Sequence, residues 1–256
     1  MTPAAAPTFS IVTICLNEAE TLRATCDSIV LQPAELFEWI VIDGGSTDGT
    51  LDILATYRDH MDTLVSEPDA GIYNAMNKGV ARARGEYLVF MNGGDRFVDG
   101  GALRSAASAL TADVVVGDVM LGDGGDTMRY PDRLPPGFLL KRMLPHQASF
   151  IRRKTFLHCG GYDESYRIAG DFELFVRLFQ NCNASYGHVP AVIAVFASGG
   201  ISQSPAHRAR RKRENHCIRW RYFPTYRFSM KAMREQLRML RDRSPCPPPA
   251  LPKPAK

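Results

Sequence analysis

A short apolar run that stops abruptly at a carboxylate and two glycines constrains the fold of this chain more than any other feature. Residues 37–42 are apolar apart from Glu38, and they lead directly into Asp43, Gly44 and Gly45. A run of this length bounded by turn residues is typical of a buried strand. The Ser/Thr/Asp cluster that follows predicts a capped helix over 49–58. Ligands of open α/β sheets bind outside the carboxyl ends of the strands, so Asp43 is a candidate ligand contact.

The same alternation of strand and helix recurs through the first half of the chain. The pattern predicts further strands at 9–16, 63–66, 86–91 and 113–119, with helices at 18–31, 71–84 and 102–110. Such alternation indicates a doubly wound, largely parallel α/β sheet. After Asp123 the pattern loosens, and it predicts strands at 147–151 and 189–196 and a helix at 169–181.

Charge is divided unevenly along the 256 residues. Residues 1–206 hold 16 basic and 24 acidic side chains, whereas residues 207–256 hold 15 basic and 3 acidic ones. This asymmetry indicates that the C-terminal part meets an anionic partner. Aromatic residues lie between the arginines of 207–243, a mixture found in helices that bind anionic lipid. A solvated basic tail, or a helix packed on the body, is the alternative. The acidic body argues against nucleic acid.

The basic region is predicted to form two helices over 205–243, broken at Pro224. Residues 1–8 are expected to be a disordered lead, and the Pro-rich residues 244–256 a disordered tail. No apolar run approaches the ~20 residues needed to span a bilayer, and no signal-peptide pattern opens the chain.

The six cysteines are expected to be reduced thiols. They form no C-x-x-C pair, no Cys/His set has zinc spacing, and the chain is too long for a disulfide scaffold. A reducing cytosol is therefore the expected setting.

Polar residues follow three strands that are predicted to end at the same edge of the sheet. They are Thr13, Asn17 and Glu18, then Asp43, then the run Asn92-Gly93-Gly94-Asp95. Each of these, taken alone, is more simply a turn or helix cap. Three together favour a ligand site, since converging carboxylates repel unless a cation or a donor-rich ligand joins them. Asp95 can offer an oxygen to a hard divalent cation, although Asn-Gly is also a hairpin signal.

Two helix starts add further candidates. Gly71 opens a helix whose N-terminus can face an anion, with Asn77 and Lys78 in its second turn; a solvated, capped helix is the alternative. Asp171 and Glu173 lie two residues apart and cannot share a helix face, so only one of them points into a cleft. We take Asp171 as the candidate general base, with an ordinary N-cap as the alternative.

Several familiar motifs are missing. The chain has no G-x-G-x-x-G and no Walker A sequence, so dinucleotide and P-loop functions lose their main support. It also lacks a G-x-S-x-G nucleophile elbow.

With these residues in hand, the chain resembles the family 2 glycosyltransferases over roughly residues 9–200. The resemblance rests on Ser10-Ile11-Val12-Thr13-Ile14 with Asn17-Glu18, on the segment 38–50, and on 66–79. The last segment and Gly199-Gly200-Ile201-Ser202 are similar to the colanic-acid and exopolysaccharide biosynthesis subgroup. The family's D-x-D appears here as Asn92-Gly93-Gly94-Asp95, and its Glu-Asp pair as Gly170-Asp171. The Q-x-x-R-W motif of processive synthases is absent.

The resemblance implies a GT-A fold, which is a Rossmann-like, doubly wound mixed sheet, over 9–204. The donor half would be about 9–123 and the acceptor half about 124–204, followed by the basic helical extension 205–243. It implies non-processive, inverting transfer of a sugar from a nucleotide-diphospho-sugar, with Mg²⁺ or Mn²⁺ on Asp95 and Asp171 as the base. The acceptor would be a saccharide, in particular a lipid-linked one.

The expected donor-binding residues are Thr13, Asn17, Glu18, Asp43, Gly71, Asn77 and Lys78. The expected lining of the site is Asn92, Gly93, Gly94, His146, Gln147, Gly170 and Ser202. The enzyme would be cytoplasmic, held at the inner face of the plasma membrane through 207–243. Two alternatives remain: a nucleotide-sugar-binding regulatory protein without transfer activity, and a nucleotidyltransferase, which would want a Gly-rich first loop that 15–18 do not provide.

Overall fold

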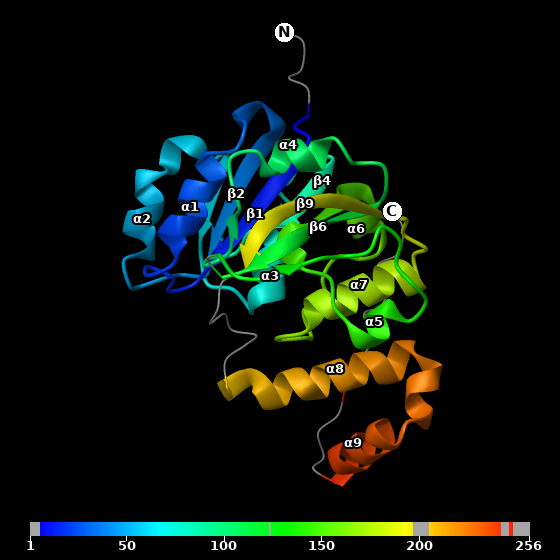
Figure 1. Ribbon diagram of the computed structural model, residues 1–256. Helices are drawn as coiled ribbons and strands as arrows, with labels where there is room; N and C mark the ends of the chain where they lie inside the picture. The colour runs from blue at the N-terminus through cyan, green and yellow to red at the C-terminus, as the bar shows by residue number, and fades with distance from the viewer. Residues whose placement is uncertain (1–5, 123, 197–204, 242–245, 248–256) are drawn as a thin grey trace.

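One twisted mixed sheet, with helices on its faces, forms the centre of the computed structural model, which describes residues 6–122, 124–196, 205–241 and 246–247 (Figure 1). The strand order is β3-β2-β1-β4-β8-β6-β9-β5, and β7 pairs with β6. The predicted lead, the tail and Ser202 lie wholly or mostly outside the described residues. Because strands from both halves of the chain join the same sheet, the donor and acceptor halves share one framework.

The first four strands are parallel, as the alternation predicts. They are β1 (Phe9–Cys15), β2 (Phe37–Asp43), β3 (Thr63–Ser66) and β4 (Tyr87–Phe90). The helices between them are α1 (Leu22–Val30), α2 (Thr50–Thr56) and α3 (Ile72–Val80). Cys15 lies beside Asp43, and the Gly93 amide donates to the Ile14 carbonyl at 3.1 Å. The three polar segments therefore do follow neighbouring strands at one edge.

The second half of the chain makes the sheet mixed. The family resemblance implies a mixed sheet, whereas the alternation of strands and helices alone predicts a largely parallel one. Its elements are β5 (Arg96–Phe97), α4 (Ala102–Ala107), β6 (Val114–Leu121), β7 (Thr127–Met128), α5 (Phe138–Lys141), β8 (Ser149–Arg152), α6 (Arg153–His158), α7 (Gly170–Gln180) and β9 (Tyr186–Phe196). β8 runs antiparallel to both β4 and β6, whereas β9 is parallel to β6. The antiparallel β8 brings the segment just before it to the carboxyl ends of β1 and β4.

Burial on both faces explains the continuous apolar runs of the central strands. Every residue of β1 is buried, and so are the last six of β2, which is the pattern of a sheet covered by helices on both sides. α3 lies close against β1 because residue 79 is glycine: a Cβ there would stand 2.4 Å from the Val12 Cγ1. The close contact fixes the helix that opens at Gly71.

The basic C-terminal region forms α8 (Arg208–Tyr222) and α9 (Met230–Arg241), with the break at Pro224 where the sequence predicts it. α8 lies between the body and α9 (Figure 1). No helix in the described part of the chain is both long and apolar enough to cross a bilayer.

The expectation of reduced cysteines is wrong for four of the six. The fold joins Cys159 to Cys182 and Cys217 to Cys246 in disulfides, with Cα–Cα distances of 6.2 and 5.5 Å. Cys15 and Cys26 are buried free thiols. The spacing of the cysteines does not predict these pairs, because 23 and 29 residues separate the partners and only the tertiary fold brings them together.

A buried carboxylate ties the start of the sheet to the end of α3. Glu38, only 2% exposed, accepts hydrogen bonds from the Ser10 hydroxyl at 2.6 Å and from the Gly85 amide at 3.0 Å. It also pairs with Arg84 Nε at 2.7 Å. Burial on its own would raise the pKa of Glu38, but these donors outweigh it and hold the pKa below its usual value.

We expect Glu38→Gln to destabilise the fold by about 1–3 kcal/mol at neutral pH, because it removes a charge that buried donors require. A carboxyl with a lowered folded pKa stabilises above its unfolded pKa and loses that contribution as the pH falls through the folded value. The gap between wild type and variant should therefore shrink below about pH 4. Urea unfolding at neutral pH and below about pH 4 measures this difference in the free energy of unfolding. Glu35→Gln, at an exposed position, is the control. An equal gap at both pH values would contradict the assignment.

Candidate active site

A cavity of about 410 Å³ opens at the carboxyl ends of the parallel strands. Its wall includes Glu18, Gly71, Asp95, His146 and Asp171 from the predicted set, together with Asn92, Gly93 and Gly94. The cavity lies where a doubly wound sheet is expected to bind its ligand. Eight predicted residues from five separate segments therefore share one wall.

The centre of this wall is an imidazole between two carboxylates. His146 Nε2 lies 3.4 Å from Asp95 Oδ2, and His146 Nδ1 lies 3.6 Å from Asp171 Oδ2. Burial alone would lower the pKa of His146, but the Asp171 and Asp95 carboxylates raise it to about 10. His146 is thus a cation that holds together two acids from different halves of the chain. The sequence marked it only as a lining residue.

Asp171 stands at the start of α7, where two neighbours fix its side chain. Its Oδ1 accepts the Phe172 amide at 2.7 Å and lies 3.5 Å from the Tyr73 hydroxyl. Burial, aided by the Asp171 carboxylate, raises the pKa of Tyr73, which keeps its hydroxyl protonated. Gly170 allows the ring to come close, since a Cβ there would stand 2.6 Å from Tyr73 Cε2. Gly170 therefore shapes the site from behind rather than lining it.

The residues beside Asp95 fit a hard divalent cation that is also held by substrate oxygens. Asn92 Oδ1 is buried and has no hydrogen-bond partner, although the side chain lines the cavity. Asn92 Nδ2 lies 3.2 Å from His146 Nε2. The described residues hold no group of three His, Cys, Asp or Glu side chains placed to bind a metal. Ligands from a bound diphosphate would therefore be needed.

Two of the predicted nucleotide contacts have side chains committed elsewhere. Thr13 is fully buried, and its hydroxyl accepts the Trp39 indole N–H at 3.0 Å. Asp43 is also fully buried; it accepts the Ser66 hydroxyl at 2.6 Å and the Gly45 amide at 3.0 Å. Burial alone would raise the pKa of Asp43, but hydrogen bonds from Ser46, Ser66 and the turn lower it. In this structure Asp43 holds the turn after β2 and does not line the cavity.

Four other predicted residues also lie outside the wall of this cavity. Asn17, with a φ of 54°, accepts the Thr47 amide at 2.9 Å and supports the turn below the site. Asn77 donates to the Tyr162 carbonyl at 3.0 Å, and Lys78 pairs with Glu67 at 2.7 Å. Gln147 donates to Asp95 Oδ1 at 3.3 Å, which orients that carboxylate from the side.

A second cavity of about 440 Å³ meets the first at Asp171 and His146. Most of its wall is apolar, with Leu121 and Met143 among the side chains, and Gln147 lines it as well. Arg142 supplies a cation on the wall. Asp171 thus faces two compartments: one that carries Asp95 and one that carries Arg142.

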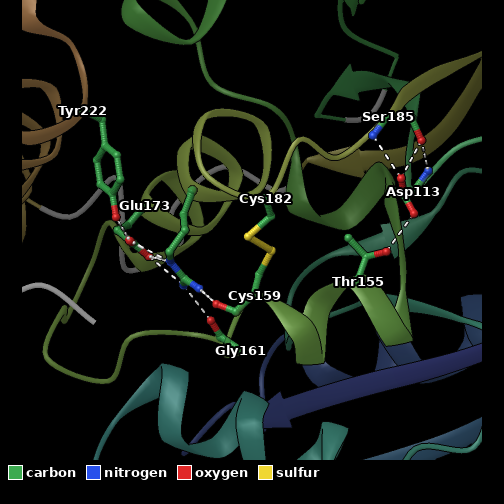
Figure 2. Close-up of a disulfide and its surroundings, with 9 residues drawn as sticks. Asp113, Thr155, Cys159, Gly161, Glu173, Cys182, Ser185 and Tyr222 are labelled. Carbon is green, nitrogen blue, oxygen red and sulfur yellow. Dashed lines mark hydrogen bonds and ion pairs between the residues drawn. A yellow bond between two sulfur atoms is a disulfide. The ribbon is translucent and has the colours of Figure 1, made fainter. Parts of the chain in front are cut away.

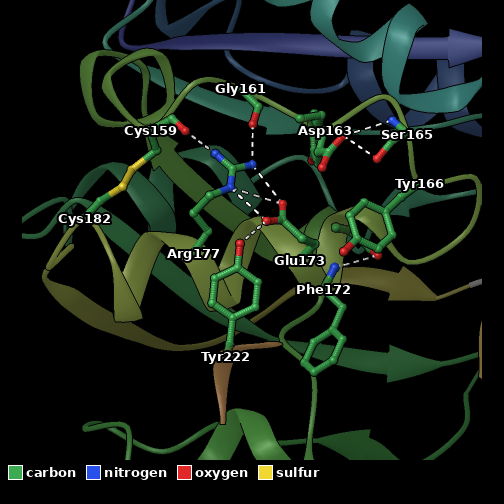
Figure 3. Close-up of polar contacts among 12 residues, drawn as sticks. Cys159, Gly161, Asp163, Ser165, Tyr166, Phe172, Glu173, Arg177, Cys182 and Tyr222 are labelled. Carbon is green, nitrogen blue, oxygen red and sulfur yellow. Dashed lines mark hydrogen bonds and ion pairs between the residues drawn. A yellow bond between two sulfur atoms is a disulfide. The ribbon is translucent and has the colours of Figure 1, made fainter. Parts of the chain in front are cut away.

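Glu173 points away from both cavities, as two-residue spacing on a helix requires. It is fully buried and pairs with Arg177 at 2.9 Å, while the Tyr222 hydroxyl from α8 donates to it at 2.6 Å (Figure 3). Arg177 in turn donates to the carbonyls of Cys159 and Gly161 (Figure 2). Since Cys159 also forms a disulfide with Cys182, the back of α7 is anchored on several sides.

Glu214 of α8 is a supporting residue that sequence reasoning missed. It is 3% exposed, and it accepts the backbone N–H groups of Arg167, Ile168 and Ala169 at 3.1, 2.9 and 2.9 Å. These three residues directly precede Gly170-Asp171. The basic run around Glu214 concealed it, because no periodic signal separates one buried acid from a solvated face. α8 is therefore part of the framework that positions Asp171.

Comparison with known proteins identifies the family. The model of glycosyl transferase family 2 matches residues 10–168. The chain belongs to this family. A PGL/p-HBAD biosynthesis glycosyltransferase of Mycobacterium tuberculosis is 35% identical over 215 residues, which cover 78% of this chain and 81% of the relative. An uncharacterized glycosyltransferase of the same species is 37% identical over 186 residues, 69% of this chain and 71% of the relative.

Solved structures share the GT-A-like fold of this family 2 glycosyltransferase. S. aureus TarS 1–349 in complex with UDP-GlcNAc matches with a TM-score of 0.68 at 17% identity, over 84% of this chain and 67% of that one. The mannosyltransferase PcManGT from Pyrobaculum calidifontis, in complex with GDP-Man and Mn²⁺, matches with a TM-score of 0.62 at 20% identity, over 84% and 64%. At these identities the likeness shows the fold alone. None of these matches identifies the colanic-acid subgroup.

We expect Glu214→Ala to destabilise this glycosyltransferase by at least about 2 kcal/mol, because two buried N–H groups, those of Ile168 and Ala169, lose their acceptor at about 1–3 kcal/mol each. Glu214→Gln keeps one acceptor oxygen and should cost less. Thermal unfolding monitored by circular dichroism measures both, with Glu164→Gln, an exposed acid, as control. Equal stability of Glu214→Ala and wild type would show that α8 does not hold the 167–169 segment.

Proposed function

We propose that this chain is an inverting, non-processive glycosyltransferase that uses a nucleotide-diphospho-sugar and a hydroxyl of a lipid-linked saccharide, in surface-polysaccharide or glycolipid biosynthesis. One observation carries the proposal: Asp171 lies where two cavities meet, within 3.6 Å of a histidine that also contacts Asp95. A base between two substrate compartments is the arrangement that direct transfer requires.

The donor would occupy the first cavity. Gly93 and Gly94 leave room for a diphosphate, and Gly71, with a φ of 123°, opens α3 toward the same space. Asp95 and Asn92 Oδ1 would hold Mg²⁺ or Mn²⁺, which neutralises the charge of a leaving diphosphate when it is bound. The complexes of TarS with UDP-GlcNAc and of PcManGT with GDP-Man and Mn²⁺ support a donor of this class. In this proposal Asp43 acts on the nucleotide by shaping the turn after β2.

The chemistry is a single displacement at the anomeric carbon. Asp171 would take the proton from the acceptor hydroxyl as its oxygen bonds to that carbon and the nucleotide diphosphate leaves from the opposite face. Tyr73 and the Phe172 amide orient the carboxylate. His146 places a compensating charge between Asp171 and Asp95, so that both acids can stand close together.

The acceptor would occupy the second cavity, whose apolar wall suits the lipid-proximal part of a lipid-linked sugar better than a bare saccharide. The basic segment 207–243 would bring this cavity to an anionic membrane at the inner face of the plasma membrane.

We expect Asp171→Asn to lower transfer by about 10²–10⁴-fold, because the amide cannot accept the acceptor proton. Donor binding should persist, since the substitution leaves the Asn92–Asp95 segment intact. Transfer is measured by release of nucleoside diphosphate in the presence of acceptor, and donor binding by thermal shift across several nucleotide sugars with Mn²⁺. Asp52→Asn, in the first turn of α2, is the control.

Two results would contradict this assignment in different ways. Near-full transfer by Asp171→Asn would show that another group is the base. Donor binding by the wild type without sugar release or transfer would instead favour the nucleotide-sugar-binding regulatory protein.

We expect Leu121→Gln to raise the KM for an octyl glycoside acceptor about tenfold, because it removes apolar contact from the second cavity. Leu51→Gln on α2 is a matched control, since both leucines are 39% exposed and only Leu121 lines the cavity. The KM for the methyl glycoside of the same sugar should change little. Equal effects on the octyl and methyl glycosides would place the aglycone elsewhere.

A further inference from the structure

The outward face of α9 carries an apolar stripe that nothing in the described structure covers. Its members are Met230, Met233, Leu237 and Leu240, which are 68%, 51%, 66% and 66% exposed. Their spacing of three or four residues places them on one side of the helix. Phe228, just before α9, is 85% exposed. Isolated exposed leucines are ordinary, but a row of four on one helix, beside an exposed phenylalanine, marks an interaction surface.

The opposite face of α9 is already occupied. Ala232 and Met239 are buried against the rest of the protein, and Gln236 Oε1 accepts a hydrogen bond at 3.1 Å from Nε2 of the buried His216 of α8. The Cys217–Cys246 disulfide ties α8 to the segment that follows α9. α9 is therefore held with its stripe turned away from the body, on the far side of α8 (Figure 1).

Charge distinguishes between the partners that such a stripe could take. Arg234, Arg238 and Arg241 are exposed on α9, and Glu235 is the helix's one acidic residue. Two copies packed stripe to stripe would bring these arginines against one another. An anionic surface would accept both the arginines and the apolar row, which is how an interfacial helix binds a membrane.

We propose that α9 is a membrane-docking helix, whose residues Met230, Met233, Leu237 and Leu240 enter the interface of an anionic bilayer while its arginines contact lipid phosphates. This deepens the membrane part of the proposed function. α8 stays with the enzyme body, through Glu214 and Tyr222, and holds the docking helix at a fixed position below the site. Docking does not require transfer activity, so the two proposals can fail separately.

The test is flotation of the full-length protein with phosphatidylcholine vesicles that contain or lack phosphatidylglycerol. We expect the wild type to float with the anionic vesicles and the double variant Leu237→Gln/Leu240→Gln to lose about tenfold in binding per leucine. The matched control is Leu31→Gln/Leu157→Gln, at positions that are 66% and 50% exposed on the body, and it should float like the wild type. Arg234→Gln should lower binding about fivefold and only with anionic vesicles.

Each other outcome overturns the proposal. Wild type that does not float, or a double variant that floats as well as wild type, would remove α9 as the docking element. Equal flotation with neutral vesicles would remove the role of charge. If the wild type forms a concentration-dependent dimer and Leu237→Gln/Leu240→Gln is monomeric, the stripe binds a second copy of this chain. Unchanged thermal unfolding of the double variant shows that any loss is not misfolding.

Discussion

The site depends on a single imidazole that joins two carboxylates from opposite halves of the chain. Asp95 follows a parallel strand of the first half, and Asp171 opens a helix of the second half. Two acids this close would repel each other, and His146 offsets that repulsion through contacts of 3.4 and 3.6 Å. The position of His146 depends in turn on β8, whose antiparallel run between β4 and β6 starts just after it. The reversal of one strand therefore assembles the site.

The sequence predicts the first half of the fold well because local signals there agree with the global structure. Apolar runs end at polar turns, and parallel pairing places those turns at one edge, as the register of β1 with β2 shows. The direction of β8 could not be read in this way, since a short apolar run reports burial and not its neighbour's orientation. The pairing of the cysteines could not be predicted from the sequence either, because only the complete fold brings the partners together.

Residue type predicted which side chains line the cavity only where those side chains were not already hydrogen-bonded within the fold. Asp95 and Asp171 lie on the cavity wall as expected. The Thr13 hydroxyl instead accepts a hydrogen bond from Trp39, and the Asp43 carboxylate accepts hydrogen bonds that hold the turn after β2. A polar residue at a strand end is thus a candidate for either role, and only the local donors decide. Glu214 shows the reverse case, a buried acid that looks like part of a solvated basic helix until its three amide partners are seen.

The basic C-terminal region divides into two parts with different physical roles, although its composition is nearly uniform. α8 has a buried acid that bonds the segment just before α7 and a tyrosine that bonds α7 itself, so removing α8 would disturb Asp171 as well as any lipid contact. A truncation at residue 206 therefore cannot separate membrane binding from catalysis. α9 exposes its apolar row and keeps its contact with His216 on the inner face, so the row can be changed without touching the site. The net charge of the region predicts an anionic partner, and the burial pattern shows which of the two helices exposes an apolar row.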